Sequence, residues 1–100
     1  MTKPNKYTKK ILENDNIYTI FYSDWCGYCE NAINLLKKHN LSFKGYKIDK
    51  IDGGIETLIQ HLTETKDLTN YDPTHTSRPI IFNKGKFVGG YSDLQQELEK

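Results

Sequence analysis

The sequence is poor in the features that usually fix a function class at once. Its 100 residues include only two cysteines, one methionine and one arginine. Two cysteines are too few for a small secreted domain that depends on disulfides. No apolar run approaches the roughly 20 residues of a membrane span, and no apolar segment typical of a signal peptide follows the basic start. These absences predict a protein of the reducing cytoplasm with no membrane partner.

Neither sign of charge dominates. Fourteen basic and 13 acidic side chains give a formal net charge of +1 at pH 7, and no block of like charges occurs. Proteins that bind nucleic acids usually carry a basic patch or stripe, so no nucleic-acid partner is expected. An apolar fraction of 36% over 100 residues is enough for one modest core. We therefore expect one domain over 1–100, with residues 1–16 as an extension or a short helix.

The spacing of apolar residues predicts alternating strands and helices. Four segments have the composition or alternation of strands: 17–22, 41–49, 79–82 and 86–88. Four have the apolar spacing of helices: a short leading one at 7–13, then 29–36, 55–62 and 91–98. Residues 63–78 show little periodicity and are expected to form a long loop. The order β-α-β-α-β-β-α predicts an α/β fold, a four-stranded mixed sheet flanked by helices, with a parallel pair first and a hairpin last.

Both cysteines lie at the junction of the first predicted strand and the next helix, as Cys26 and Cys29. Unpaired N–H groups and the helix dipole at such a junction favour the thiolate of Cys26, which is the form that attacks disulfides. Cys29 lies one turn deeper on the same face and can reach the first sulfur. The pair is therefore predicted to be redox-active. A zinc site would need two more ligands, and His39, His61 and His75 are scattered.

Three separated motifs resemble the glutaredoxin family, over most of 17–98. WCGYC (25–29) is similar to the redox centre of that family, and SRPIIF (77–82) resembles the segment that holds its cis-proline. VGGYSDL (88–94) resembles the Gly-Gly-x-x-Asp element that holds one end of glutathione. The resemblance implies a thioredoxin-like fold.

The resemblance also implies a glutathione-dependent thiol–disulfide oxidoreductase that reduces protein disulfides and glutathione mixed disulfides. Cys26 would attack the substrate, and either a second glutathione or Cys29 would release the product. Glutathione would be a co-substrate, so no tightly bound cofactor and no metal are expected. The partners would be glutathione and disulfide-containing or glutathionylated proteins, and a monomer is expected. The glutathione-binding residues implied by the motifs are Tyr28, Arg78, Pro79, Gly89, Gly90, Ser92 and Asp93.

The chain departs from the family pattern close to its first cysteine. Ser23, followed by the acidic Asp24, stands where the family usually carries a lysine. Arg78 stands where a valine usually precedes the cis-proline, and its charge is one replacement for the missing cation. Lys66 and His75 are two others, although loop residues of this kind are more often only solvated. We expect the helix N-terminus to lower the pKa of the first cysteine, but less than the lysine would.

Two other functions stay open from the sequence. Gly27 replaces the proline between the cysteines, as in family members that hold a [2Fe–2S] cluster between two protomers with Cys26 and glutathione as ligands. Trp25 instead resembles the tryptophan of the thioredoxin centre WCGPC, so the second alternative is a thioredoxin that a flavoprotein reductase reduces. Tyr28 and the Gly-Gly element argue against a thioredoxin.

Overall fold

A mixed sheet of four strands runs through the middle of the molecule in the order β2-β1-β3-β4. In this computed structural model, which describes residues 2–99, the strands are β1 (Tyr18–Tyr22), β2 (Phe43–Lys47), β3 (Ile80–Asn83) and β4 (Lys86–Gly89). β1 and β2 are parallel, β3 is antiparallel to β1, and β4 is antiparallel to β3. The predicted parallel pair and terminal hairpin are both confirmed.

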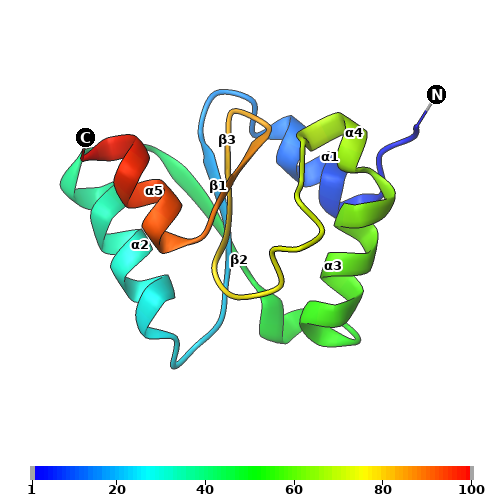
Figure 1. The fold of residues 1–100 in the computed structure, drawn as a ribbon, viewed down its shortest axis with the longest axis horizontal. Helices are drawn as coiled ribbons and strands as arrows, with labels where there is room; N and C mark the ends of the chain where they lie inside the picture. Colours follow the sequence, from blue (N-terminus) through cyan, green and yellow to red (C-terminus); the bar gives the residue numbers. More distant parts are fainter. Residues whose placement is uncertain (1, 100) are drawn as a thin grey trace.

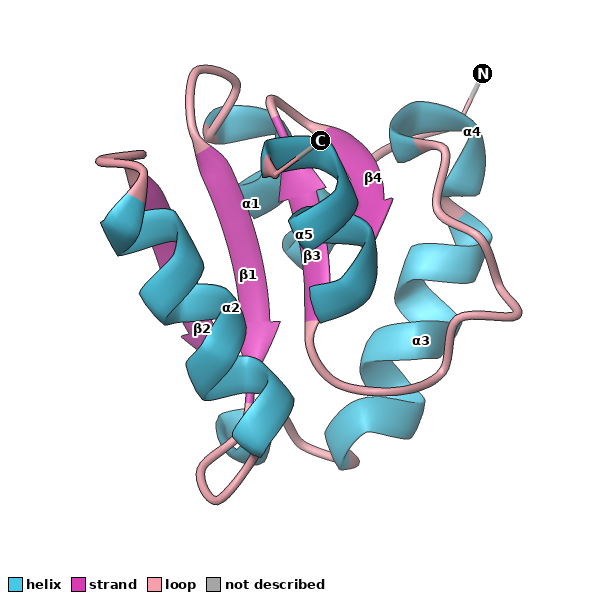
Figure 2. Cartoon of the chain, turned by 60° about the vertical axis from the view of Figure 1, so that its left-hand side comes forward, coloured by secondary structure: helices cyan, strands magenta, loops and turns pink. Residues whose placement is uncertain are grey.

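Helices cover both faces of the sheet (Figure 1, Figure 2). They are α1 (Lys6–Glu13), α2 (Gly27–Lys38), α3 (Gly54–Glu64), α4 (Lys66–Thr69) and α5 (Tyr91–Leu98), with a short 3-10 helix η1 (Ile48–Lys50). α2 and α5 lie on one face, and α1 and α3 lie on the other. The leading helix expected at 7–13 is therefore present. Among residues 2–99, no helix has the length and apolar character needed to span a membrane.

Alternation along the central strands divides the core between the two faces. Ile20 of β1 and Ile81 of β3 pack against α2 and α5, whereas Phe21 and Phe82 pack against α1 and α3. All four side chains are fully buried. Successive strand residues point to opposite faces, so a sheet covered on both sides needs a continuous apolar run. The sequences YTIFY and IIF supply such runs.

Local signals in the sequence explain where several elements begin and turn. The side chain of Asn5 accepts the N–H of Thr8 at 3.1 Å and so caps α1, as asparagine commonly does. The hairpin between β3 and β4 turns at Lys84 and Gly85, whose φ angles are 53° and 84°. Positive φ at both central residues is typical of the tight turns that suit twisted strands.

The expectation of a long loop over 63–78 is wrong in part. α3 continues to Glu64, and α4 follows over Lys66–Thr69. The buried side chains of this stretch include threonines: Thr65 and Thr69 are buried, and the hydroxyl of Thr65 contacts that of Thr8 in α1. Hydroxyl-bearing residues give no apolar periodicity, so hydrophobic spacing could not indicate the helix. The second strand is likewise shorter than expected, because the chain enters η1 at Ile48.

Candidate active site

Cys26 is the N-cap residue of α2, directly after the loop that leaves β1. A disulfide joins it to Cys29, and its sulfur also accepts the N–H of Cys29 at 3.2 Å. The side chain of Cys29 is 1% exposed, whereas Cys26 is partly exposed. The sulfur of the partly exposed Cys26 therefore lies at the positive end of a helix dipole, which favours the thiolate form. Within residues 2–99, no three or more His, Cys, Asp or Glu side chains cluster as metal ligands.

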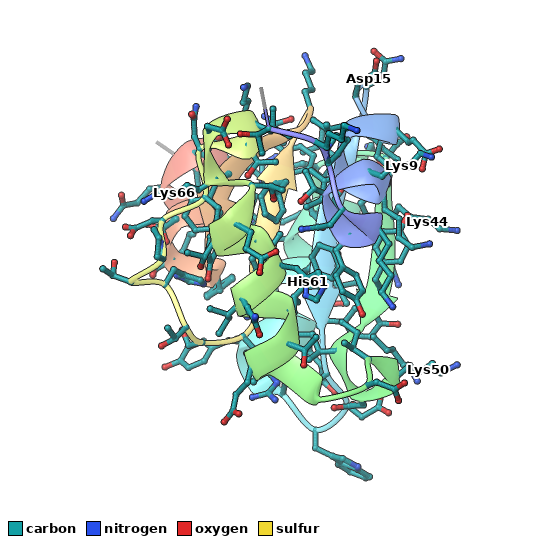
Figure 3. All side chains as sticks on the ribbon, turned by 90° about the vertical axis from the view of Figure 1, so that its right-hand side faces the viewer. Lys9, Asp15, Lys44, Lys50, His61 and Lys66 are labelled. Carbon is teal, nitrogen blue, oxygen red and sulfur yellow. A yellow bond between two sulfur atoms is a disulfide. The ribbon has the colours of Figure 1, made fainter. Side chains whose placement is uncertain are left out.

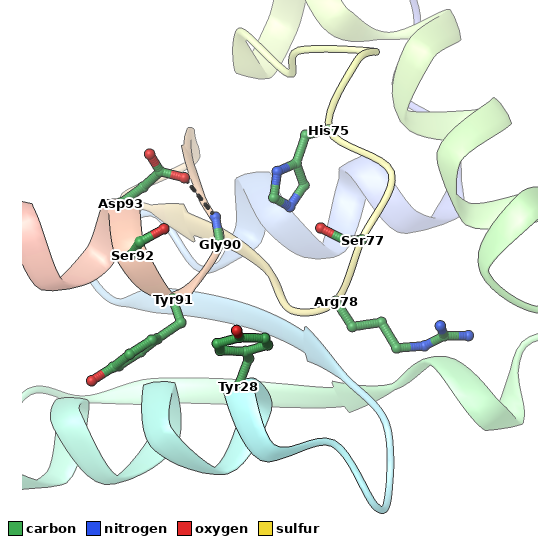
Figure 4. Close-up of a pocket in the computed structure, with 8 residues that line it drawn as sticks. All are labelled: Tyr28, His75, Ser77, Arg78, Gly90, Tyr91, Ser92 and Asp93. Carbon is green, nitrogen blue, oxygen red and sulfur yellow. Dashed lines mark hydrogen bonds between the residues drawn. The ribbon is translucent and has the colours of Figure 1, made fainter.

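A cavity of about 470 Å³, here called cavity A, brings together three distant parts of the chain (Figure 4). α2 contributes one tyrosine, the segment before β3 contributes one side of the lining, and the start of α5 contributes the opposite side. The residues that line it are Tyr28, His75, Ser77, Arg78, Gly90, Tyr91, Ser92 and Asp93. Five of the seven residues that the motifs implied for glutathione binding thus face one cavity, and Pro79 and Gly89 do not line it.

The two residues that do not line cavity A hold its walls in place. The peptide bond between Arg78 and Pro79 is cis, as expected, and the carbonyl of Pro79 accepts Nε2–H of His75 at 3.1 Å. Gly89 has a φ of 133°, and a Cβ there would collide with the carboxylate of Asp93. That carboxylate accepts the N–H of Gly90 at 3.0 Å at the start of α5.

Arg78 reaches the position where the family lysine is missing. Its Nε donates to Oγ of Ser23 at 2.7 Å, and Ser23 is only 8% exposed. Arg78 also lines a second cavity of about 510 Å³, here called cavity B, whose lining includes Cys26. Of the three cations considered from the sequence, Arg78 borders both cavities, His75 borders cavity A alone, and Lys66 borders neither.

The acidic loop before Cys26 is held by charges from the end of β2. Asp24 pairs with Nζ of Lys47 at 3.3 Å, and its N–H donates to Oδ2 of Asp49 at 3.1 Å. Trp25 is fully exposed and adopts a φ of 60°, which is uncommon outside glycine. Sequence reasoning missed Lys47 and Asp49. The signal was available, because the carboxyl ends of parallel strands such as β1 and β2 meet at one edge of a sheet.

The segment that carries His75 is fixed by side chains just before it. The hydroxyl of Tyr71 donates to the carbonyl of His75, and burial raises the pKa of Tyr71. The carboxylate of Asp72 accepts the N–H of Thr74 at 2.9 Å and its hydroxyl at 2.7 Å. These hydrogen bonds from Thr74 lower the pKa of Asp72. Ser77 and Tyr91 were also missed as lining residues; Tyr91 was assigned only to a helix face, and its ring centroid lies 6.3 Å from that of Tyr28.

Known proteins are similar to this chain in sequence and fold. The sequence profile of the Glutaredoxin family matches residues 17–88. A probable glutaredoxin of Acanthamoeba polyphaga mimivirus is 45% identical over 82% of this chain and 77% of the viral protein. Glutaredoxin-1 of Gallus gallus is 34% identical over 82% of this chain and 73% of its own length. The solution structure of a dithiolic glutaredoxin from Trypanosoma brucei brucei is 27% identical, with a TM-score of 0.72 over 96% of this chain and 88% of that one. The fold is thus thioredoxin-like, the cysteine pair supports a thiol–disulfide oxidoreductase, and the chain belongs to the glutaredoxin family.

Proposed function

We propose that the protein is a glutathione-dependent oxidoreductase that reduces protein disulfides and glutathione mixed disulfides. The observation that carries this proposal is the place of Cys26: a partly exposed sulfur at a helix N-terminus, backed by the buried Cys29. Cys26 lines cavity B, which shares Tyr28 and Arg78 with cavity A. A ligand in cavity A would therefore lie next to the reacting atom. The glutathione pool of a reducing cytoplasm would supply the electrons.

Cavity A carries charges that suit the two ends of glutathione, a tripeptide with two carboxylates and one ammonium. At one end, the first N–H groups of α5 suit a carboxylate, and the carboxylate of Asp93 suits the ammonium. At the other end, the guanidinium of Arg78 suits the second carboxylate. Tyr28 stands between them and offers a ring for the peptide to pack on (Figure 4). Among the structural neighbours of this chain, a buckwheat glutaredoxin has been solved as a complex with glutathione.

The proposed reaction has two transfers at sulfur. The thiolate of Cys26 attacks the glutathione sulfur of a mixed disulfide, and the substrate leaves as a thiolate that takes up a proton. A second glutathione, as its thiolate, then attacks the glutathione bound to Cys26, which releases the cysteine and forms glutathione disulfide. The sulfur of the substrate thiol gains one electron and the sulfur of the second glutathione loses one, while the transferred glutathione stays at the disulfide oxidation level. Protein disulfides would use Cys29 to resolve the mixed disulfide with Cys26.

Turnover of a small glutathione mixed disulfide tests the proposal. Replacing Cys26 by Ser should abolish activity, because the remaining cysteine, Cys29, is buried. Replacing Cys29 by Ser should leave most of this activity, because glutathione can complete the cycle without a resolving thiol. The measurement is the rate of glutathione disulfide formation with both variants and the unaltered protein at equal concentration.

Three results would contradict the proposal. Full activity of the Cys26→Ser variant would show that Cys26 is not the nucleophile. Turnover that needs a flavoprotein reductase but not glutathione would indicate a thioredoxin. A brown protein isolated without oxygen in the presence of glutathione, whose colour is lost in Cys26→Ser, would indicate a [2Fe–2S] carrier instead.

A further inference from the structure

A third cavity, here called cavity C, lies away from the cysteines. It opens between α1, β2 and η1 and has a volume of about 190 Å³. Its lining comprises Tyr7, Lys10, Phe21, Tyr46, Lys47, Lys50 and Ile51. None of these residues lines cavity A or cavity B. Figure 3 views the molecule from the side on which the ends of Lys9, Lys44 and Lys50 stand out.

The floor of cavity C is aromatic and already ordered. Phe21 is fully buried and stacks on Tyr46, with ring centroids 5.5 Å apart and planes inclined by 28°. The hydroxyl of Tyr46 accepts Nδ2–H of Asn14 at 3.1 Å. Tyr7 is 7% exposed and meets the ring of His61 edge-on. An apolar floor whose side chains are fixed by neighbours needs little rearrangement to accept a flat ring.

The rim of cavity C carries only positive charge. Lys10, Lys47 and Lys50 are its ionisable cations, and none of its lining residues is acidic. Nζ of Lys10 lies 5.3 Å from the ring centroid of Tyr46. In the part of the chain that the structure describes, the one ion pair made by these three lysines joins Lys47 to Asp24 of the active-site loop. An apolar floor below a cationic rim is complementary to a ligand with a ring and a negative group.

We propose that cavity C is a second binding site, for a free small molecule with a single ring and one anionic group such as a phosphate or carboxylate. The volume of about 190 Å³ lies below the roughly 300–1,000 Å³ of sites for drug-sized ligands, so the occupant is small. The ring packs against Tyr46 and Ile51, above the buried Phe21, and the anion is held by the lysines of the rim.

The ligand of cavity C competes with the active-site loop for one lysine. The ammonium of Lys47 cannot serve Asp24 and an anion in the cavity equally well. The two ion pairs are therefore linked, and removing one partner strengthens the other. Asp24 stands two residues before Cys26, so a ligand bound in cavity C weakens an ion pair of the loop that carries the nucleophile.

Titration of the disulfide form with phenyl phosphate tests the site, with amide chemical shifts as the measurement. Inorganic phosphate and phenol, at the same ionic strength, supply the anion and the ring separately. Phenyl phosphate should shift Tyr7, Tyr46 and Ile51 saturably, and each separate probe should bind about tenfold more weakly, since it loses either the apolar burial or the ion pairs. Equal binding by phosphate or phenol alone overturns the proposal, as does a short phosphotyrosine peptide that binds tenfold more tightly.

Single substitutions locate the site and its link to the loop. Lys50→Gln should weaken phenyl phosphate binding about two- to fivefold, as expected for one exposed charge pair. Lys9→Gln, on an exposed lysine of α1 outside the lining, is the matched control and should leave the affinity unchanged. Asp24→Asn should tighten binding by a similar factor, because it frees Lys47. Equal effects of the two lysine changes, or no change with Asp24→Asn, contradict the proposal, and circular dichroism verifies that each variant is folded.

Discussion

Arg78 links two parts of the site that lie 55 positions apart in the sequence. Its Nε is held by Ser23, and within residues 2–99 that is the hydrogen bond that anchors the guanidinium. The two terminal nitrogens keep the planar fork that recognises carboxylates, a geometry that lysine lacks. The sequence indicated both the missing lysine at Ser23 and Arg78 as a replacement. It could not indicate the hydrogen bond, which depends on how the loop after β1 meets the segment before β3.

Replacing Arg78 by Gln should raise KM for a glutathione mixed disulfide by about three- to tenfold. A hydrogen bond to a charged group contributes about 1.5–3 kcal/mol, and exposure of the side chain reduces that figure. Arg78→Lys should recover part of the loss, because it restores the charge without the planar fork. Steady-state kinetics against glutathione mixed-disulfide concentration provide the measurement. A KM that stays the same in Arg78→Gln would show that this guanidinium does not contact the substrate.

At the scale of elements, hydrophobic spacing predicts the strands and the longer helices, but it does not predict segments that are buried through polar side chains. The strands and the longer helices were predictable because Ile20, Phe21 and their neighbours form an apolar run in a sheet covered on both faces. α4 was not predictable, because threonines such as Thr69 bury it. The contact of Asp49 with the active-site loop was also missed, although the parallel pairing of β1 and β2 places the residues after both strands at one edge of the sheet.

The turn after α4 provides a test based on pH. Hydrogen bonds from Thr74 lower the pKa of Asp72 from its ordinary value of 3.8. A carboxyl whose pKa is lower in the folded than in the unfolded protein stabilises the fold above its unfolded value, and this stabilisation is lost as the pH falls through the folded value. Asp72→Asn should therefore lower Tm at pH 6, and its difference from the unaltered protein should shrink below about pH 4.

Thermal unfolding of both proteins from pH 6 to pH 2.5 gives the comparison. Thr74→Val provides the matched control, because it removes the hydroxyl donor and keeps the charge. NMR titration of that variant should show the pKa of Asp72 closer to 3.8. A Tm difference that grows on acidification would mean that folding raises the pKa of Asp72 instead of lowering it.

For the whole molecule, each of the two cores on opposite faces of the sheet includes a helix that lies outside the part of the chain matched by the family profile. The core on the side of α3 includes α1, which lies outside the part of the chain that matches the family profile. Ile11 is fully buried there, and Nδ2–H of Asn5 donates to the carbonyl of His61 at 2.7 Å. The leading helix is thus packed and hydrogen-bonded as part of the fold.

Ile11→Ala should lower the free energy of unfolding by about 2–5 kcal/mol, the usual cost of removing a large buried aliphatic side chain. Lys9→Ala, on the exposed side of the same helix, should change it by less than about 0.5 kcal/mol. Urea unfolding followed by circular dichroism measures both. A loss below about 1 kcal/mol for Ile11→Ala would show that α1 unfolds separately from the rest, since typical core substitutions cost more.

The sulfur of Cys26 has a structural role as well as a chemical one, because it accepts the hydrogen bond that caps α2. A thiolate accepts a hydrogen bond more strongly than a disulfide sulfur does. Each change of oxidation state therefore alters how firmly the first turn is wound, and by reciprocity the winding biases the oxidation state. The tendency of the Cys26–Cys29 disulfide to accept electrons therefore depends in part on the stability of the first turn of α2. A substitution that loosens the first turn of α2 should therefore change the reduction potential of the cysteine pair, even if it replaces neither cysteine.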